Sequence, residues 1–362
     1  QQQGEYAVHF DATLLAKYLK QIGIERKINF IDGIVEDIQT DENSYITGIK
    51  LQNGLLIKTD FVFDCTGFKR LVIGKHYQSK WIDYSEIIPN NRAIAFFIKN
   101  TSKQIPPYTE SIATDYGWVW KIPIQDRFGC GFVFNSNLTS DDLIKQEILK
   151  LFPGEDIEFG KTFNFDAGCY EKVWIKNCVA VGLASGFIEP LEATSLMLSV
   201  ITLTHLSFSL PGLLYRKQSY IDKYNEIVSQ RNKDILDFIY LHYLTKRKDN
   251  NYWIHFNNRT NIPDKLKSTL DQLESFSSFN DYYSRTIGLF PDTFGLDSYI
   301  AVLSGLGLFN NEDLKIHFNS LKYLNTFDRE ITYGEELKQA NLDLCKVSMK
   351  HTEFIESIKN EN

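Results

Sequence analysis

The sequence predicts a protein of mixed α and β structure, either α+β or an α/β domain with a helical cap. Short apolar stretches, alternating or continuous and bounded by turn residues, predict strands between residues 28 and 134. A buried strand is expected at 179–181, and an apolar helix follows Pro190. Beyond Ser219 the chain is charged and has helical spacing. Strands concentrated ahead of helices are typical of such folds.

The elements can be assigned in order along the chain. The first helix is expected over residues 11–21, where Leu14, Tyr18 and Leu19 share one face and Asp11 can cap the first turn. Asn53-Gly54 predicts a tight hairpin. The strands are expected at 28–31, 34–39, 46–52, 55–58, 61–63, within 92–134 and at 179–181. Further helices are expected at 141–152, from about 190 to 210, where Pro211-Gly212 should end the helix, at 220–247 and at 326–359.

Composition narrows the functional classes. The chain has 46 acidic and 39 basic residues, a net charge of −7, so it lacks the basic surplus of a nucleic-acid binder. Five cysteines without C-x-x-C spacing favour reduced thiols in a cytoplasmic protein, and the histidines show no metal-ligand spacing. The apolar segment 193–215 contains Ser, Thr and His205 and is interrupted at Pro211-Gly212, so we expect no membrane span. The 14% of aromatic residues fit either an aromatic-rich core or a pocket for a flat organic ligand.

Two expected strands run directly into glycine turns, at Phe63-Asp64-Cys65-Thr66-Gly67 and at Val181-Gly182-Leu183-Ala184-Ser185-Gly186. A glycine directly after a buried strand lets the backbone approach a ligand at the carboxyl edge of a sheet. Either turn alone could equally serve sheet–helix packing. Together they resemble the later cofactor contacts of glutathione-reductase-type flavoproteins, although the first Gly-x-Gly-x-x-Gly loop of that fold is absent.

The segment 186–195, Gly-Phe-Ile-Glu-Pro-Leu-Glu-Ala-Thr-Ser, combines a carboxylate with a helix start. A helix is expected to begin near Glu192, after the rigid Pro190, with the backbone amides of Thr194 and Ser195 facing outward. Amides at the positive end of a helix form an anion site. A plainer interpretation is that Glu192 complements the helix dipole and Thr194 caps the helix.

The segment Gly117-Trp118-Val119-Trp120-Lys121-Ile122-Pro123 places two tryptophans on one face of a strand. On its own, such a pair is most simply a core contact. All four fixed positions, Trp118, Trp120, Ile122 and Pro123, nevertheless match the W-x-W-x-I-P signature of flavin-dependent halogenases. The signature is thought to keep the flavin site from working as a monooxygenase.

The chain resembles flavin-dependent halogenases of the tryptophan halogenase family over most of residues 5 to 310. The resemblance also covers residues 6–11, 64–68, 186–195 and Gly305-Leu306-Gly307. It implies an FAD-binding domain of the glutathione-reductase, or p-hydroxybenzoate-hydroxylase-like, type. We expect the remainder of this domain over residues 1–210, with an inserted β-sheet at about 80–165. A mostly helical substrate-binding region is expected over residues 211–362.

The resemblance also implies roles for individual residues. Glu192 matches the catalytic glutamate, and Thr194 and Ser195 match residues whose backbone amides hold chloride. Some relatives have glycine in place of Ser195. The flavin contacts are expected at Val35, Gly67, Gly182, Leu183 and Leu196, and the substrate pocket at Tyr282, Tyr283 and Phe294. No residue is expected to hold a metal.

The implied reaction uses reduced FAD (FADH2) and O2 to convert chloride or bromide to hypohalous acid, which halogenates an electron-rich aromatic. The resemblance implies a separate flavin reductase as partner, and it is compatible with a homodimer. The family's pocket glutamate, which holds the ammonium group of tryptophan, falls at Leu289. Because leucine cannot offset the cost of burying an ammonium ion, we expect a neutral indole- or phenol-type substrate.

The family's catalytic lysine and glycine loop would lie upstream of Gln1, and the sequence has no initiator Met. We therefore expect the first βαβ unit to be missing, and these 362 residues alone to bind FAD poorly and not to halogenate. Two alternatives stay open: a flavin monooxygenase of related fold, and a non-catalytic halogenase-like remnant. Halide-dependent product mass separates the first from a halogenase. The upstream coding sequence separates a remnant from a fragment.

Overall fold

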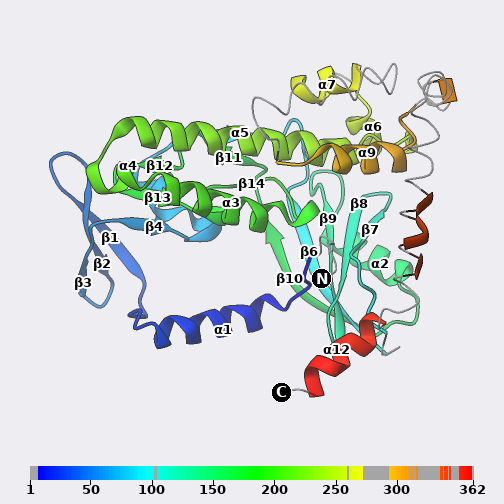
Figure 1. The fold of residues 1–362 in the computed structure, drawn as a ribbon, viewed down its shortest axis with the longest axis horizontal. Helices are drawn as coiled ribbons and strands as arrows, with labels where there is room; N and C mark the ends of the chain where they lie inside the picture. The colour runs from blue at the N-terminus through cyan, green and yellow to red at the C-terminus, as the bar shows by residue number, and fades with distance from the viewer. Residues whose placement is uncertain are drawn as a thin grey trace. The chain divides into compact units, whose positions relative to one another are not determined.

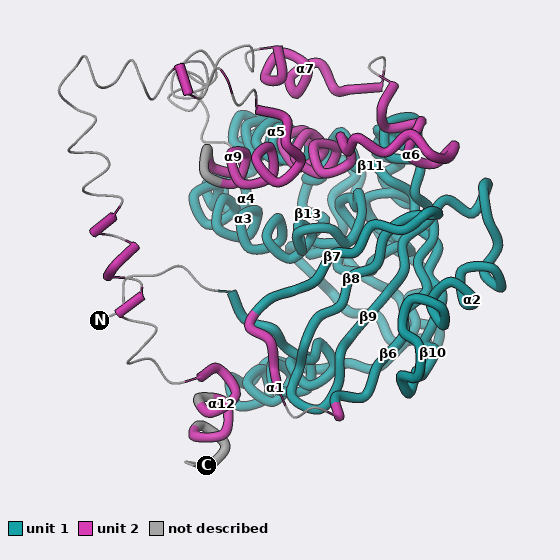
Figure 2. Tube along the Cα trace, turned by 90° about the vertical axis from the view of Figure 1, so that its right-hand side faces the viewer, with its two compact units in different colours: residues 1–100, 108–232 teal, residues 101–107, 233–362 magenta. Residues whose placement is uncertain are grey.

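The computed structural model describes residues 7–101, 104–258, 261–271, 293–309 and 350–360, together with a few single positions between 312 and 343. The chain forms two compact units, coloured separately in Figure 2. Unit 1 comprises residues 1–100 and 108–232, and unit 2 comprises residues 101–107 and 233–362. The boundary between them falls within helix α5 (Gln218–His242). The expected domain division at residue 210 stays a prediction.

The first helix and hairpin of unit 1 form where the sequence places them. Helix α1 (Ala12–Glu25) begins after Asp11, whose carboxylate accepts hydrogen bonds from the amides of Thr13 and Leu14 at 2.8 and 3.1 Å. Strands β1 (Val35–Thr40), β2 (Ile46–Leu51) and β3 (Leu56–Lys58) form an antiparallel sheet in that order. Gly54 makes the β2–β3 turn with a φ of 85°. The strand expected at 28–31 is wrong, because this stretch joins no ladder with any described residue.

The buried strand β4 (Val62–Asp64) pairs in parallel with β13 (Cys178–Ala180), with Val62 opposite Cys178 and Asp64 opposite Ala180. The short strand β12 (Trp174–Ile175) pairs with the other edge of β13. After β4 the chain forms the one-turn helix η1 (Gly67–Lys69) and the π-helix η2 (Leu71–His76). After β13 it forms the one-turn helix η3 (Gly182–Ala184). Both glycine turns therefore leave the same edge of one sheet.

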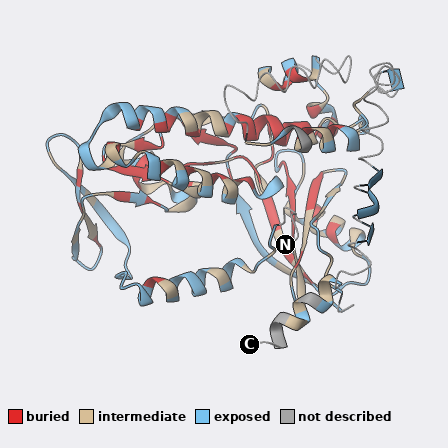
Figure 3. Ribbon diagram, viewed as in Figure 1, coloured by how far each residue is buried: buried red, intermediate tan, exposed pale blue. Residues whose placement is uncertain are grey.

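A five-stranded antiparallel sheet occupies the strand-rich stretch after residue 92, and Figure 1 shows its strands side by side. Its order is β10 (Ile157–Asn164), β6 (Arg92–Lys99), β9 (Arg127–Phe134), β8 (Gly117–Pro123) and β7 (Glu110–Ala113). Helix α2 (Asp141–Leu151), capped by Ser140, buries Ile144 and Ile148 against the sheet. Within this sheet, the buried residues are concentrated in the central strands β6, β9 and β8 (Figure 3), where Phe96, Val119 and Phe132 are fully covered.

Unit 1 ends in helices that differ from the expected single segment. A third small sheet, β14 (Gly186–Phe187), β11 (Gly168–Tyr170) and β5 (Trp81–Asp83), precedes the one-turn helix η4 (Leu191–Ala193). Helix α3 (Thr194–Phe208) starts two residues later than predicted. Helix α3 ends at Phe208, close to the expected end at about residue 210, but Pro211 and Gly212 belong to a new helix, α4 (Leu210–Tyr215). Proline near the first turn of a helix loses no hydrogen bond.

The helices of unit 2 that the structure describes are α6 (Asn251–Phe256), α7 (Asp264–Asp271), α9 (Leu296–Gly305) and α12 (His351–Asn360). Most of the helix expected at 326–359 falls outside the described residues. Among the described residues, the stretch Leu191–Phe208 alone is long and apolar enough to be considered as a membrane span. It is interrupted at residues 192–193, and α3 itself has 15 residues. At 1.5 Å per residue, α3 is shorter than the ~30 Å hydrocarbon core of a bilayer.

Candidate functional site

The two glycine turns meet at the carboxyl edge of the parallel β4–β13 pair, where η1 and η3 contact each other. Gly67 and Gly182 begin these turns with φ values of 62° and 65°, in the left-handed region that favours glycine. The amide of Val181 donates to the carbonyl of Asp64 at 3.1 Å and joins the two strand ends. The structure thus brings together two predicted flavin contacts that lie far apart in the sequence.

Asp64 holds the first turn in shape, a role that the sequence reading missed. Its side chain is buried, and one carboxylate oxygen accepts from the amide and hydroxyl of Thr66 at 3.1 and 2.6 Å. The other oxygen accepts from the amides of Val72 and Ile73 at 2.9 and 2.8 Å. Four donors satisfy the buried carboxylate and fix the turn that presents Gly67. An acidic residue placed directly after an apolar strand is the signal that could have found it.

The expected flavin contacts fit a flat organic group. A Cβ built on Gly67 would meet no described atom within 4 Å, so the turn faces open space. Leu196 is 56% exposed and Val35 is 36% exposed, although both are apolar, while Leu183 is partly covered. Exposed apolar side chains and bare glycine backbone are what an aromatic ring system covers on binding. These residues are therefore compatible with FAD.

The carboxylate of the candidate site stands on a strained turn. Glu192 and Ala193 have φ values of 61° and 50°, so two successive non-glycine residues adopt the left-handed conformation directly before α3. Such a conformation costs of order 1–3 kcal/mol per residue, and it concentrates at functional sites. Both side chains are exposed. The turn therefore presents the Glu192 carboxylate at the surface, beside the start of α3.

The anion site predicted at this helix start is compatible with the geometry, with one correction. Helix α3 begins at Thr194, so its first amides, including those of Thr194 and Ser195, have no carbonyl partner within the helix. Among the described residues, no side chain caps this helix, so the alternative role of Thr194 as a cap is wrong. The Thr194 side chain is buried, and Ser195 is partly exposed.

A hydrogen-bonded serine and a buried glutamate tie this turn to the rest of unit 1. Ser199 donates to the carbonyl of Ser195 at 2.7 Å, and its Oγ lies 3.5 Å from a Cβ built on Gly182. Glu189 is fully buried, and its carboxylate accepts from the Asn90 side-chain amide at 3.0 Å. The start of α3 therefore packs against the second glycine turn. Neither Glu189 nor Ser199 has a sequence pattern that predicts these contacts.

The tryptophan signature forms part of β8. Trp118 is 5% exposed and Trp120 is partly covered, with ring centroids 5.9 Å apart. Trp120 lies across Gly131 of β9, where any Cβ would overlap its indole ring. The Trp118 Nε1–H is buried and finds no hydrogen-bond partner among the described residues. Pro123 is buried, and Ile122 is partly buried.

The predicted substrate residues lie in unit 2 or outside the described part of the chain. Tyr282, Tyr283 and Leu289 belong to the latter. Phe294 stacks on Phe238 of α5, with ring centroids 3.8 Å apart and an interplanar angle of 19°. This stacking shows that an aromatic pair exists in unit 2. It does not by itself assign a substrate pocket.

Comparison with known proteins places these features in a family. The tryptophan halogenase family matches residues 1–317. Tryptophan 7-halogenase KtzQ of Kutzneria sp. (strain 744) is 30% identical over 332 residues, which cover 86% of this chain and 60% of that protein. The 7-chloro-L-tryptophan 6-halogenase KtzR of the same organism is 31% identical over 312 residues, which cover 83% of this chain and 58% of that protein.

Solved structures agree with the sequence match. BrvH, a flavin-dependent halogenase from Brevundimonas sp. BAL3, superposes with a TM-score of 0.84 at 28% identity and covers 96% of this chain and 69% of its own. A thermophilic tryptophan halogenase from Streptomycin violaceusniger gives a TM-score of 0.82 at 28% identity, with 95% and 66% covered. The chain spans 60% of the length of KtzQ and 58% of that of KtzR. By sequence and by fold, the chain belongs to the tryptophan halogenase family.

Proposed function

We propose that the protein functions in FAD-dependent halogenation of an electron-rich, tryptophan-type aromatic compound. The observation that carries the proposal is the strained Glu192–Ala193 turn, which sets a carboxylate beside the amides that open α3. The same helix packs through Ser199 near the glycine turn at Gly182. The candidate anion site, the Glu192 carboxylate and the sheet edge that could hold a flavin therefore all belong to unit 1.

Each group at this site has a chemical task in the proposal. Gly67, Gly182, Leu183, Leu196 and Val35 would hold the flavin against the sheet edge. Bound FAD, in its reduced form and with O2, supplies the oxidising power that turns chloride or bromide into an electrophilic halogen. The amides of Thr194 and Ser195 hold the halide, because the positive end of a helix attracts anions. The buried Trp118 and the partly covered Trp120 of β8 would exclude water from their side of the unit.

Glu192 would act at the aromatic substrate. Its carboxylate orients the electrophilic halogen and then accepts the proton that the ring loses. In that substitution a carbon–halogen bond forms, a carbon–hydrogen bond breaks, and the electron pair of the latter returns to the ring. Strain in the turn limits the conformations of Glu192, which favours one orientation of the carboxylate.

The substrate and the partners are part of the proposal. The relatives KtzQ and KtzR are named for tryptophan and 7-chloro-L-tryptophan. Here Leu289 replaces the acidic residue that the family resemblance places at the substrate ammonium, so we favour a neutral indole or phenol over free tryptophan. A separate flavin reductase would supply reduced FAD. A cytoplasmic location and a homodimeric state complete the proposal.

The decisive experiment uses the full protein as its gene encodes it, with FAD, a flavin reductase, O2 and an indole substrate. Mass spectrometry of the product in chloride, in bromide and without halide should give a halogen isotope pattern that follows the halide supplied. Glu192→Gln should lower the turnover at least a hundredfold while flavin binding stays unchanged. A hydroxylated product that forms without halide would identify a monooxygenase and refute the proposal.

A further inference from the structure

Unit 2 contains a cavity of about 620 Å³ for which the proposed halogenation has no use. Its walls come from the segment that follows α5, from α7 and from the turn after α9. The described residues that line it all belong to unit 2. Its volume falls in the range of pockets that hold small organic molecules.

The charge of this cavity is strongly one-sided. Lys246, Lys248 and Lys267 line it, and among the described lining residues Asp271 alone is acidic. In the described part of the chain, none of the three ammonium groups forms a salt bridge, and all three side chains are exposed. Three cations facing one carboxylate make the cavity attractive to an anion.

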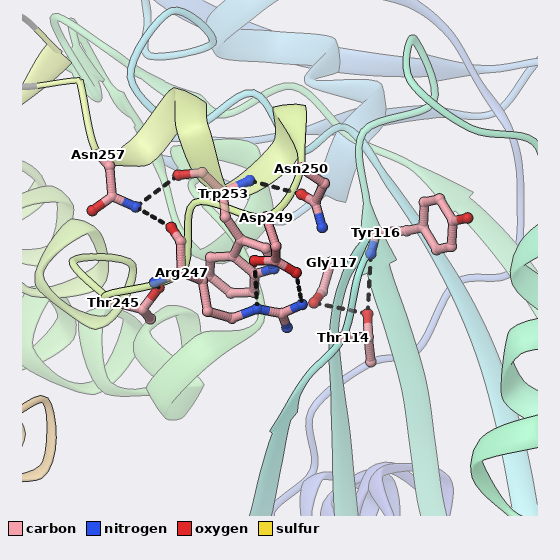
Figure 4. Close-up of polar contacts among 9 residues, drawn as sticks. All are labelled: Thr114, Tyr116, Gly117, Thr245, Arg247, Asp249, Asn250, Trp253 and Asn257. Carbon is pink, nitrogen blue, oxygen red and sulfur yellow. Dashed lines mark hydrogen bonds and ion pairs between the residues drawn. The ribbon is translucent and has the colours of Figure 1, made fainter.

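Arg247, which lies between Lys246 and Lys248 in the sequence, differs from them because its charge is paired. Its guanidinium is paired with Asp249, with Nε–Oδ1 and Nη2–Oδ2 distances of 3.1 and 2.6 Å, and it lies over the Trp253 ring (Figure 4). The charge of Arg247 is therefore neutralised locally. Lys246 and Lys248, on either side of it, line the cavity instead.

The backbone that carries these lysines is fixed by hydrogen bonds, as Figure 4 shows. The side-chain amide of Asn257 donates to the carbonyls of Arg247 and Trp253 at 2.7 and 2.9 Å. The Thr245 hydroxyl accepts from the Arg247 amide at 3.3 Å. Asn250 caps α6 by accepting from the Trp253 amide at 3.1 Å. A loop held in this way loses little further freedom when a ligand binds.

Apart from Thr245 and Asn257, the uncharged residues described in the lining are apolar. Leu244, Ile262, Leu270 and Leu308 are partly buried and face the same cavity. A simple inorganic anion would leave these side chains in contact with water, whereas an apolar molecule would leave the lysines uncompensated. We propose that the cavity binds an amphipathic organic anion, with its carboxylate or sulfonate at the lysines and its apolar body against the leucine side.

The proposal predicts a specific ranking of ligands in isothermal titration calorimetry on the full chain. Octanoate should bind, while inorganic phosphate, which has charge alone, and 1-octanol, which has the apolar body alone, should bind at least tenfold more weakly. Because this site is separate from the Glu192 turn, Glu192→Gln should leave the octanoate affinity unchanged. Phosphate or octanol binding as tightly as octanoate would overturn the proposal.

Variants test which residues are responsible. Replacing Lys246, Lys248 and Lys267 together with Gln should weaken octanoate binding by about tenfold. Lys233→Gln, which removes an exposed lysine of unit 2 outside the cavity lining, is the matched control and should change nothing. Asp271→Asn should tighten binding, because it removes a carboxylate that repels the ligand anion. An unchanged affinity in the triple variant, or weaker binding in Asp271→Asn, would show that the cavity is not the anion site.

Discussion

At the scale of single residues, the two left-handed positions before α3 can be tested by their dependence on side-chain shape. Ala193 has a φ of 50° and an exposed side chain, so packing contributes little at this position. A β-branched residue fits this conformation worse than alanine does, and glycine fits it freely. We expect Ala193→Val to lower the free energy of unfolding by about 1–2 kcal/mol, and Ala193→Gly to raise it by up to about 1 kcal/mol. Urea denaturation of both variants measures the difference, and equal stabilities would contradict the strained turn.

The glycine turns allow a second test at the same scale. Gly182→Ala places a Cβ at a φ of 65°, and it should lower stability by about 1 kcal/mol and weaken flavin binding. Gly54→Ala is the control, because its φ of 85° is also left-handed and a Cβ there would meet no described atom within 4 Å, but it lies in the β2–β3 hairpin. Both variants should lose similar stability, and only Gly182→Ala should lose flavin affinity. Flavin fluorescence titration of the full protein measures the affinity. An equal loss of flavin affinity in both variants would show that the flavin does not bind at the Gly182 turn.

At the scale of elements, the tryptophan signature depends on a glycine in the neighbouring strand. A Cβ on Gly131 would overlap the Trp120 indole, so Gly131→Ala should cost about 1–3 kcal/mol of stability. Gly129, two residues earlier in β9, is the matched control, because the nearest atom to a Cβ there is the Ile122 carbonyl oxygen at 4.0 Å. Gly129→Ala should therefore be nearly neutral. Thermal unfolding of the two variants measures this difference. Equal midpoint temperatures would show that the Trp120 ring moves to make room for the added Cβ.

How much of these elements the sequence predicts depends on whether local patterns determine them. Asp11 and the Asn53-Gly54 dipeptide act through hydrogen bonds and turn geometry within a few residues, and both α1 and the β2–β3 hairpin form as expected. The apolar residues at 28–31 have the pattern of a strand, but a strand also needs a partner, which a local pattern cannot supply. Pro211-Gly212 predicts the end of a helix, and α3 does end at Phe208, but Pro211 lies in the first turn of the next helix, α4, where proline is favourable.

The same limit applies to the candidate site. The local sequence predicts the two glycine turns and the carboxylate beside a helix start, and the family resemblance assigns expected roles to Glu192 and Thr194. Two features escaped prediction: the left-handed pair that delays α3 to Thr194, and the buried Glu189–Asn90 contact. The first is a backbone conformation that alanine and glutamate seldom adopt. The second joins residues far apart in the sequence. Neither leaves a periodic pattern.

At the scale of the whole molecule, the cysteines report on the integrity of the fold. Cys130, Cys169 and Cys178 are buried, and burial raises the pKa of Cys130 to about 12. Cys65 is exposed, and partial desolvation together with the Asp64 carboxylate raises its pKa above the ordinary value. In the Cys345→Ser background, we expect a thiol reagent at pH 8 to modify Cys65 alone, more slowly than a free cysteine, and faster as the pH rises.

The thiol-labelling experiment has two controls and one outcome that would contradict the prediction. In denaturant all four remaining thiols should react, and Cys65→Ser should abolish the reaction of the native protein. Absorbance of the released thiol, followed over time, gives both the number of groups and their rates. A second reactive thiol under native conditions would mean that the core around Cys130 or Cys178 opens readily.

The parallel pairing of β4 with β13 also determines when this region can form during synthesis. Val62 leaves the ribosome long before Cys178, and the entire five-stranded sheet is translated between them. A nascent chain must therefore keep β4 without its partner until the later strand emerges. In chains that end before residue 178, we expect the five-stranded sheet to resist protease while the segment Phe61–Asp64 remains cleavable.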